Sequence, residues 1–476
     1  MNKNILFLIL LAIVSLSTVN YTFAQESTHS KNDIAVIENN SHTVEHELPN
    51  TVMVIPFIVL LVMIATGPIL YPHFWEHQYP KISIFLGTIV VIYYSFFLHN
   101  TTSLLHTAAE YFSFIALLSS LFFASGGIMI KVDKKATPLL NVGILFFGAI
   151  IANLIGTTGA SMLLIRPFIK INQTRIKPYL IVFFIFIVSN IGGALTPIGD
   201  PPLFLGFLRG IDFFWFIEHI WYIWLPTVTL VLAIFYFIDS RNNISIANKL
   251  TKEYTGKIEF KGAKNLIYLA IILLAVFIDP NVMSWVPNLA PSPIGLREII
   301  QFSVVILAMK TSDSEILKYN EFNAEPIKEV AYLFIGIFAT MIPALQLISY
   351  EANVLGDKLT VGMFFWSTGL LSGVLDNAPT YLNFLSAALG KFGFDINIAT
   401  DVKEFMNVDY IFLQAISVAA VFFGAMTYIG NGPNFMVKSI VERAGIEMPS
   451  FFAYVYKYSL PILIPVFVIV WLIFYF

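Results

Sequence analysis

Apolar residues dominate the chain and gather in long runs that short polar segments separate. Ten of these runs are candidate membrane spans, and they lie near residues 52–70, 82–98, 110–130, 178–208, 213–238, 265–278, 297–309, 327–348, 408–440 and 451–475. A helix of about 20 apolar residues crosses the hydrocarbon core of a bilayer. The pattern therefore predicts an all-α polytopic membrane protein, with the lipid bilayer as its main partner.

Two further apolar stretches, near 138–169 and 360–390, are interrupted by Gly, Pro, Asn and Thr at their middles. Cytoplasmic loops collect Lys and Arg, so these residues indicate the side from which each stretch enters. With the chain starting outside, 20 of the 27 Lys and Arg fall in inner loops and 5 in outer loops if 138–169 returns to the cytoplasm and 360–390 to the periplasm. Each stretch is thus predicted to be a re-entrant hairpin.

The two hairpins divide the chain into halves of the same make-up. The first repeat, 51–238, holds the hairpin 138–169 and a broken helix over 178–208; after a cytoplasmic loop over 239–264, the second repeat, 265–476, holds the hairpin 360–390 and a broken helix over 408–440. Each half has five spans, and this odd number forces the second half to insert upside down. The prediction is an inverted repeat, the architecture of many secondary transporters.

The residues themselves repeat at two places. The nine-residue stretch TPIGDPPLF, which begins at Thr196, matches TYIGNGPNF, which begins at Thr427, at a constant offset of 231, so that Asp200 faces Asn431. At the hairpin tips, NLIGT over 153–157 matches DNAPT over 376–380. These matches fall where the topology independently requires a repeat.

The N-terminal segment has the features of a secretory signal peptide. Lys3, an apolar run from Ile5 to Leu16 and small residues up to Ala24 predict a signal peptide over 1–24. An uncleaved first span is the alternative. The polar segment 25–50 is expected to be a disordered periplasmic tail. Because ten spans follow, the C-terminus is predicted to be periplasmic too, in an inner membrane of the bacterial type.

Composition excludes several classes of protein. The chain is 57% hydrophobic and 12% charged, with a mean hydropathy of +0.78, whereas soluble domains carry about 25% charged residues. A water-soluble globule is therefore excluded. The net charge is −3 and no block of Lys and Arg could follow a phosphate backbone, so no nucleic-acid partner is expected. Cysteine is absent, which excludes thiolate chemistry, and no cofactor is predicted beyond transported or coupling sodium ions and protons.

The Gly and Pro residues of the two matching stretches must break their helices in mid-membrane. Unwound backbone is tolerated there only where it lines a cavity. Its carbonyls, together with Thr hydroxyls and a carboxylate, suit a small hard cation. The N-termini of the half-helices offer N–H groups to an anion. The pattern therefore leaves a small inorganic cation and a small carboxylate both open as ligands.

Two acidic residues, Asp200 and Asp376, are predicted near mid-membrane, where an ionised carboxylate costs at least about 2.5 kcal/mol. Each is a candidate sodium ligand or proton acceptor, and a cap of its broken helix is the alternative. The candidate residues for ion or substrate binding are Asn153, Thr157, Thr158, Asn190, Thr196, Gly199, Asp200, Asp376, Asn377, Thr380, Thr427, Gly430 and Asn431. The amides, Asn434 included, and the hydroxyls either bind the ligand or satisfy backbone groups freed by the breaks.

Other charged residues are predicted to have a different role. Arg166, Glu110, Glu218, His219 and Glu329 fall near the ends of predicted spans, where they are expected to be interfacial anchors. No Lys or Arg falls at either hairpin tip or helix break in the sequence. A multiply charged anion would thus depend on helix ends and bound cations.

At these residues the chain resembles the ion transporter superfamily, which includes arsenite pumps, NhaD-type sodium/proton antiporters and citrate and dicarboxylate carriers of the CitMHS type. The strongest likeness is SNIGGALTPIGDPPLFLGF over 189–207; GTTGAS over 156–161, VLDNAPT over 374–380 and EVAYLFIGIFATMIP over 329–343 extend it. The resemblance implies a scaffold and a transport core in each half, ligand sites at the tips and breaks, and a homodimer joined through the scaffolds.

These features predict a secondary active transporter. A membrane-embedded enzyme is disfavoured because the sequence has no HExxH, no Gly-x-Ser-x-Gly and no Asp-rich diphosphate motif. Sodium/proton exchange is favoured, because each half presents one mid-membrane Asp and no fixed positive charge. Citrate or dicarboxylate symport with sodium or protons is the alternative, and arsenite-like efflux comes third.

Overall fold

The computed structural model of the protein describes residues 48–242, 256–279, 283, 286, 287 and 293–476. The predicted signal peptide over 1–24 lies outside the described residues. So do residues 25–47 of the predicted tail and 243–255 of the predicted cytoplasmic loop.

The first half of the chain is built from helices, several of them interrupted. In chain order they are η1 Thr51–Val54, α2 Ile55–Leu70, α3 Pro72–Phe96, α4 Thr101–Gly126, α5 Pro138–Ile171, α6 Pro178–Ile187, η2 Ile191–Leu195, α7 Pro201–Leu208 and α8 Trp215–Ser240.

The second half continues in the same way. Its helices are α9 Ala263–Val276, α10 Leu296–Thr311, α11 Ser314–Tyr319, α12 Glu325–Leu355, η4 Gly356–Lys358, α13 Val361–Ser372, α14 Asn377–Lys391, α15 Ala399–Val408, α16 Tyr410–Phe423, η5 Gly424–Met426, α17 Gly432–Arg443, α18 Phe451–Tyr454, the π-helix η6 Val455–Leu463 and α19 Ile464–Phe474.

The structure confirms an all-α polytopic membrane protein. Among the described residues, eight helices are long and apolar enough to cross a membrane, or nine when α15 and α16, bent by 97°, are taken as one broken span. The ten predicted spans exceed this number partly because α9 has only 14 residues. At 1.5 Å per residue such a helix is about 21 Å long, which is less than the hydrocarbon thickness of about 30 Å.

Helix α5 is folded back on itself at Gly156. This residue alone in α5 has non-helical backbone angles, φ 78° and ψ 154°, which glycine adopts most readily. The side chains of Asn141 and Asn172, near the two ends of α5, exchange hydrogen bonds of 2.8 and 2.9 Å. In a straight helix their 31-residue separation would place them about 46 Å apart. Helices α13 and α14 pack as a second hairpin, which turns at residues 373–376.

Strands occur at one place in the described chain. Strand β1, Met129–Val132, follows α4 and pairs antiparallel with β2, Ile258–Lys261, which precedes α9. The pairing aligns Met129 with Lys261 and Val132 with Ile258. The hydrophobic pattern did not predict these strands, because each has only four residues and lies in a connection between helices. The pairing is compatible with the predicted topology, which assigns both connections to the cytoplasm.

Two helix starts lie earlier than the hydrophobic pattern predicted. Helix α3 begins at Pro72 rather than near 82, so Lys81, one of the 20 basic residues assigned to inner loops, is an exposed residue within the helix. Helix α4 begins at Thr101 rather than near 110, because the side chain of Asn100 caps it by accepting a hydrogen bond from the Ser103 backbone N–H. The first turns of α3 and α4 contain polar residues, so the hydrophobic pattern alone did not indicate where these helices begin.

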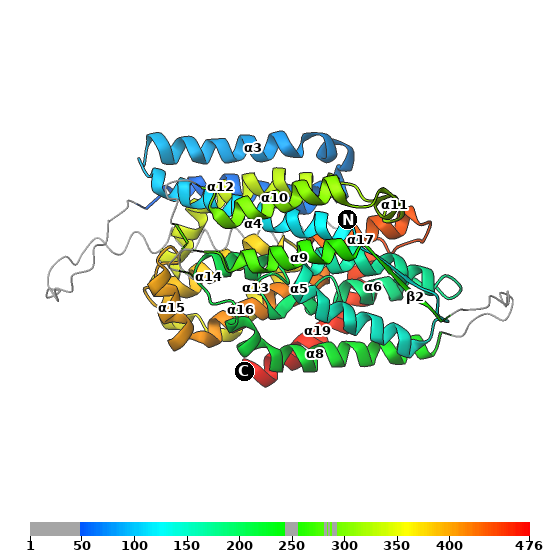
Figure 1. Cartoon of the computed structure of the whole chain (residues 1–476). Coiled ribbons are helices and arrows are strands. Elements are labelled where there is room, and N and C mark those ends of the chain that lie inside the picture. Colours follow the sequence, from blue (N-terminus) through cyan, green and yellow to red (C-terminus); the bar gives the residue numbers. More distant parts are fainter. Residues whose placement is uncertain (1–47, 243–255, 280–282, 284–285, 288–292) are drawn as a thin grey trace, which may run out of the picture. The chain divides into compact units, whose positions relative to one another are not determined.

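The interrupted helices lie in the middle of the bundle. Figure 1 shows α3 at one edge and α8 at the opposite edge, with α5, α13, α14 and α16 between them. Helix α12 packs against α3, α4 and α14, while α13 packs against α16 and η2 against α5 and α8. All residues from Leu180 to Ile187 of α6 are buried, as expected of a helix that is apolar on every side. The helix breaks therefore sit away from the surrounding lipid.

Candidate functional site

The first helix break lies between α6 and α7. Its chain passes through η2 and an extended Thr196 to Asp200, which is the N-cap residue of α7. The Thr196 hydroxyl donates to the Asn153 carbonyl at 2.6 Å and accepts from the Gly199 N–H at 3.1 Å. A Cβ atom on Gly199 would lie 2.1 Å from the Gly193 carbonyl oxygen, so only glycine fits there.

The second break, between α16 and α17, has the same local structure. Thr427 has φ −140° and ψ 169°, against −139° and 155° for Thr196. Its hydroxyl accepts from the Gly430 N–H at 3.0 Å, and a Cβ atom on Gly430 would lie 2.7 Å from the Gly424 oxygen. Asn431 is the N-cap residue of α17, as Asp200 is of α7. The likeness at an offset of 231 residues supports the predicted repeat.

Asp200 joins the two breaks and both hairpins through its side chain. The residue is fully buried. Its Oδ1 accepts from the Thr157 hydroxyl and from the Asn431 amide, each at 2.9 Å, and its Oδ2 accepts from the Asn377 amide at 2.6 Å. These three donors come from α5, from the N-cap of α17 and from α14. We call them, together with Asp200, the Asp200 cluster. The carboxylate is thus shared by four segments that are distant in sequence.

A second layer of asparagines supports this cluster. The Asn431 amide also donates to Asn190 Oδ1 at 3.1 Å, and the Asn190 amide donates to Asn434 Oδ1 at 2.7 Å. Asn434 in turn donates to the carbonyls of Gly424 and Thr427, both at 2.8 Å. Since these carbonyls lie in unwound backbone, Asn434 satisfies groups that the helix break leaves free.

Asn153 performs the matching task in the first break. Its amide donates to the Gly192 carbonyl at 2.7 Å, and its Oδ1 accepts from the Leu195 N–H at 2.8 Å. Trp224 of α8 donates to the same Gly192 carbonyl at 3.1 Å. Nothing local in the sequence around Trp224 indicates this contact, because α8 is far from the break in the chain.

Among the described residues, Asp376 has no hydrogen bond to the Asp200 cluster, although it lies close enough to Asp200 for electrostatic repulsion between the two carboxylates. It is half-buried, and its Oδ1 accepts from the Ala378 N–H at 3.0 Å, which caps α14. Thr380 donates to the Asp376 backbone carbonyl at 2.9 Å. No hydrogen bond within the described part of the chain joins Asp376, Thr380 or the half-buried Thr158 to Asp200. The structure thus gives Asp376 the capping contact that the sequence left as the alternative.

The hairpin tips align differently from the sequence match. Thr157 directly follows the turn at Gly156, and Asn377 is the first residue of α14, so these two hold the same place in their hairpins. The sequence match paired Thr157 with Thr380, three residues further on. The physical reason is that the first hairpin turns at one glycine, whereas the second needs residues 373–376.

Four helix N-termini meet at the Asp200 cluster. Thr157 and Asn377 begin the second arms of the hairpins, and Asp200 and Asn431 cap α7 and α17. Helix N-termini carry partial positive charge and favour negative groups. Pro201, Pro202, Pro379 and Pro433 occupy first-turn positions of three of these helices, where a missing N–H leaves no unsatisfied donor. Within the described residues no Lys or Arg donates to the cluster.

Two of the charged residues expected to be interfacial anchors have mostly buried side chains: Glu110 is 6% exposed and Arg166 is 14% exposed. Glu110 of α4 forms an ion pair with Arg209, with Nε–Oε1 at 2.5 Å, and a second contact from Nη2 at 2.8 Å. Arg209 also donates to Asn397 at 2.5 Å. Glu110 lies about two and a half turns inside α4, because that helix starts earlier than predicted. Glu218 is exposed, as an interfacial anchor would be.

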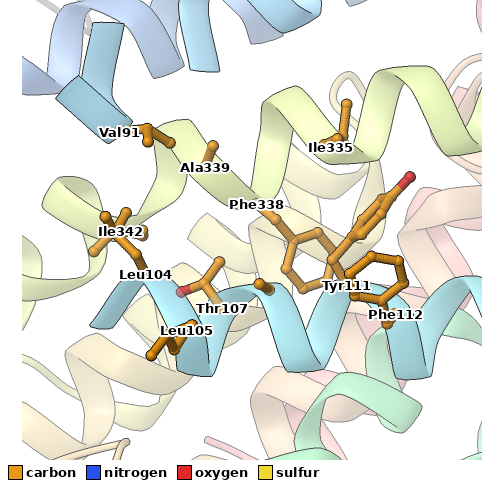
Figure 2. Close-up of a pocket in the computed structure, with 11 residues that line it drawn as sticks. Val91, Leu104, Leu105, Thr107, Tyr111, Phe112, Ile335, Phe338, Ala339 and Ile342 are labelled. Atoms are coloured by element: carbon orange, nitrogen blue, oxygen red, sulfur yellow. The ribbon is translucent and has the colours of Figure 1, made fainter. Parts of the chain in front are cut away.

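A groove of about 330 Å³ lies away from the cluster, between α3, α4 and α12. Figure 2 shows that its labelled lining is apolar except for Thr107 and Tyr111. The Tyr111 hydroxyl already donates to the Ala331 carbonyl at 3.0 Å. The groove thus lacks the polar groups that would orient a small ligand, and the candidate site remains the Asp200 cluster.

An all-helical membrane fold whose broken helices meet at a buried carboxylate defines a secondary transporter. Residues 45–475 match the CitMHS_2 family, described as "Putative citrate transport", and the chain belongs to that family. It is also similar to a "46 kDa membrane protein" of Mycobacterium leprae (strain TN), with 23% identity over 263 residues, which are 54% of this chain and 58% of that protein.

Proposed function

We propose that the protein is a cation-coupled carrier of small carboxylates, with citrate as the first candidate, and that the Asp200 cluster is its binding site. The family description supports citrate as substrate. The observation that carries the proposal is the convergence of four helix N-termini on one carboxylate.

Charge arithmetic supports an anion at this place. Each helix N-terminus is equivalent to about +0.5 elementary charge, so four of them supply about +2. Asp200 and Asp376, whose carboxylate caps α14, contribute at most −1 each. With both ionised the charges balance, and a sodium ion or a proton bound at either carboxylate makes the field attractive to a substrate carboxylate.

The same carboxylate supports coupling to a cation. An ionised carboxylate in mid-membrane costs at least about 2.5 kcal/mol. Sodium or a proton bound at Asp200 would remove this cost and release for the substrate the Asn377 and Asn431 amides that donate to the carboxylate. Binding of cation and carboxylate would then favour one another, which is the basis of symport.

Proteoliposome transport with sodium, lithium and citrate supplied in turn tests the proposal. We expect citrate to accumulate when an inward sodium or proton gradient is imposed, and not without one. Asp200→Asn should lose this accumulation while retaining the elution profile of the parent. Proton movement driven by sodium in the absence of citrate would overturn the proposal.

Sodium/proton exchange is the second candidate, and one observation favours it. Among the described side chains, the Asp200 cluster has one carboxylate and only uncharged hydrogen-bond donors. Sodium and a proton would then compete for Asp200. The carrier would bind one or the other in alternation, which gives exchange. A pH-sensitive dye inside citrate-free proteoliposomes separates this candidate from symport.

We also propose that residues 51–238 and 265–476 are inverted repeats, in an inner membrane, with the N-terminal tail and the C-terminus in the periplasm. The matched breaks and the two hairpins support the repeat. If α5 is re-entrant from the cytoplasm, cysteines introduced at Lys135 and Lys170 should be labelled from the same side. Labelling from opposite sides would reject the topology. A homodimer joined through the scaffolds remains part of this proposal, to be tested by cross-linking.

A further inference from the structure

Four arginines of the described chain have mostly buried side chains, and one of them differs from the rest. Arg175 pairs with Asp239 at 2.8 Å, Arg209 with Glu110 at 2.5 Å, and Arg297 with Glu298 at 2.7 Å. Arg166 has only Glu321, at 3.8 Å. Its Nη1 atom is buried and has no hydrogen-bond partner among the described residues.

An unpartnered buried donor is costly. Leaving one unsatisfied costs about 1–3 kcal/mol, and more when the group is charged. The Arg166 side chain is 14% exposed, so water reaches little of it, whereas Glu321 is 66% exposed. A surface ion pair of this kind contributes about 0–1 kcal/mol, which does not offset the cost of the buried guanidinium. The arrangement therefore points to an anionic ligand for Arg166.

The position of Arg166 connects it to the Asp200 cluster. It lies on the second arm of α5, nine residues beyond Thr157, or about 14 Å along the helix. Helix α17, which starts beside Asn431, packs against α5, and Met162 and Met436 share one apolar contact cluster there. Both helices thus run from the Asp200 cluster to a region that contains Arg166.

A second positive charge, on α17, interacts electrostatically with Arg166. Arg443, the last residue of α17, lies close enough to Arg166 for electrostatic repulsion between the two. Lys170, one turn beyond Arg166 on α5, has its ammonium 6.0 Å from the centre of the Tyr319 ring. Like charges held together with one loosely bound carboxylate form an attractive field for an anion.

We infer that Arg166, supported by Arg443, forms an anion-binding station for the carboxylate substrate, separate from the Asp200 cluster and reached along α5 and α17. The inference rests on the proposed carboxylate transport. A guanidinium binds a carboxylate through two parallel N–H···O bonds, which gives Arg166 a use for its free donor. One small carboxylate does not bridge about 14 Å, so the substrate occupies the station and the cluster in turn.

Glu321 occupies the station when substrate is absent. It lies in the connection between α11 and α12 and has φ 44°, a left-handed conformation that is uncommon outside glycine. Its exposed carboxylate reaches towards Arg166 as a substrate carboxylate would. Because this ion pair is loose, substrate can displace it, and removal of Glu321 should strengthen substrate binding.

Citrate transport by the full chain in proteoliposomes tests the station, with the half-saturation constant and the maximal rate measured separately. Arg166→Gln should raise the half-saturation constant roughly tenfold or more, because a charged hydrogen bond is lost, and Arg166→Lys should restore part of it. Glu321→Gln should lower the constant below that of the parent. Lys438→Gln is the matched control on α17, since Lys438 already pairs with Glu442 at 2.8 Å, and it should leave the constant unchanged.

The outcomes separate this inference from the proposed function. If the parent transports citrate and both Arg166→Gln and Glu321→Gln have its half-saturation constant, the station is refuted and the transport proposal stands. If the parent neither transports nor binds citrate, both are refuted. Should Arg166→Gln fail to fold, Glu321→Gln still decides, because a surface carboxylate is not needed for folding and an unchanged constant overturns the inference.

Discussion

The two helix breaks have the same backbone and different chemistry. Asp200 has φ −135° and ψ 142°, and Asn431 has φ −155° and ψ 138°, each as the N-cap of a half-helix that begins with Pro or Gly. Yet one residue is a carboxylate and the other an amide that donates to it at 2.9 Å. The second break thus completes the first, so that two related segments form one cluster around one carboxylate.

The two hairpins also differ in the ion pairs that hold their ends. At the ends of α5, Asn141 and Arg175 both contact Asp239, at 3.0 and 2.8 Å, and all three are buried. Near the ends of the α13–α14 hairpin, Lys391, whose side chain is 6% exposed, meets a fully exposed Asp357 at 3.3 Å. Both partners of the ion pair at the first hairpin are thus buried, whereas at the second hairpin the carboxylate is in water.

The largest effect is expected from removing the charge that distinguishes the two breaks. Asp200→Asn should abolish coupled transport, because an amide neither binds a proton nor carries the charge that attracts sodium. Folding should persist, since asparagine occupies the matching position at 431. Transport is measured in proteoliposomes and folding by size-exclusion chromatography. Coupled transport at the parental rate would show that the carboxylate is not needed.

The next effect concerns the hairpin bases. Asp239→Asn leaves the buried Arg175 without its ionic partner and should lower the free energy of unfolding by about 3–5 kcal/mol. Asp357→Asn, the matched change at the other hairpin, should have no measurable effect. Unfolding in mixed micelles provides the measurement. Equal stability of the two variants would contradict the difference between the hairpins.

A smaller effect should distinguish the two glycines that allow the breaks. A Cβ atom would lie 2.1 Å from a carbonyl oxygen at Gly199 but 2.7 Å from one at Gly430. Gly199→Ala and Gly430→Ala should both destabilise by overpacking, by about 1–3 kcal/mol, with Gly199→Ala the worse of the two. Thermal unfolding in detergent ranks them, and the reverse order would argue against equivalent breaks.

The smallest effect is expected at Asp376. Asparagine caps a helix about as well as aspartate, so Asp376→Asn should keep both stability and transport near the parental values. The sequence predicts that Asp376 and Asp200 are both mid-membrane carboxylates that bind sodium or a proton. If Asp376→Asn lost transport as completely as Asp200→Asn, the site would contain two carboxylates rather than one.

Much of the fold and part of the site could be predicted from sequence. Long apolar runs predict spans, and the TPIGDPP stretch predicts a helix break with Asp200 because Gly and Pro act locally. Contacts between distant segments carry no local signal: Glu110 gives no indication of Arg209, nor Asn190 of Asn434. The tip register was also wrong, because apolar runs do not show how many residues a turn needs.

One measurement tests most directly whether the Asp200 cluster is the site of coupled carboxylate transport. Citrate uptake is followed in proteoliposomes of the parent and of Asp200→Asn, each with and without an inward sodium gradient and, separately, a proton gradient. We expect gradient-dependent uptake in the parent and none in Asp200→Asn under either gradient. Gradient-dependent citrate uptake by Asp200→Asn at the parental rate would contradict it.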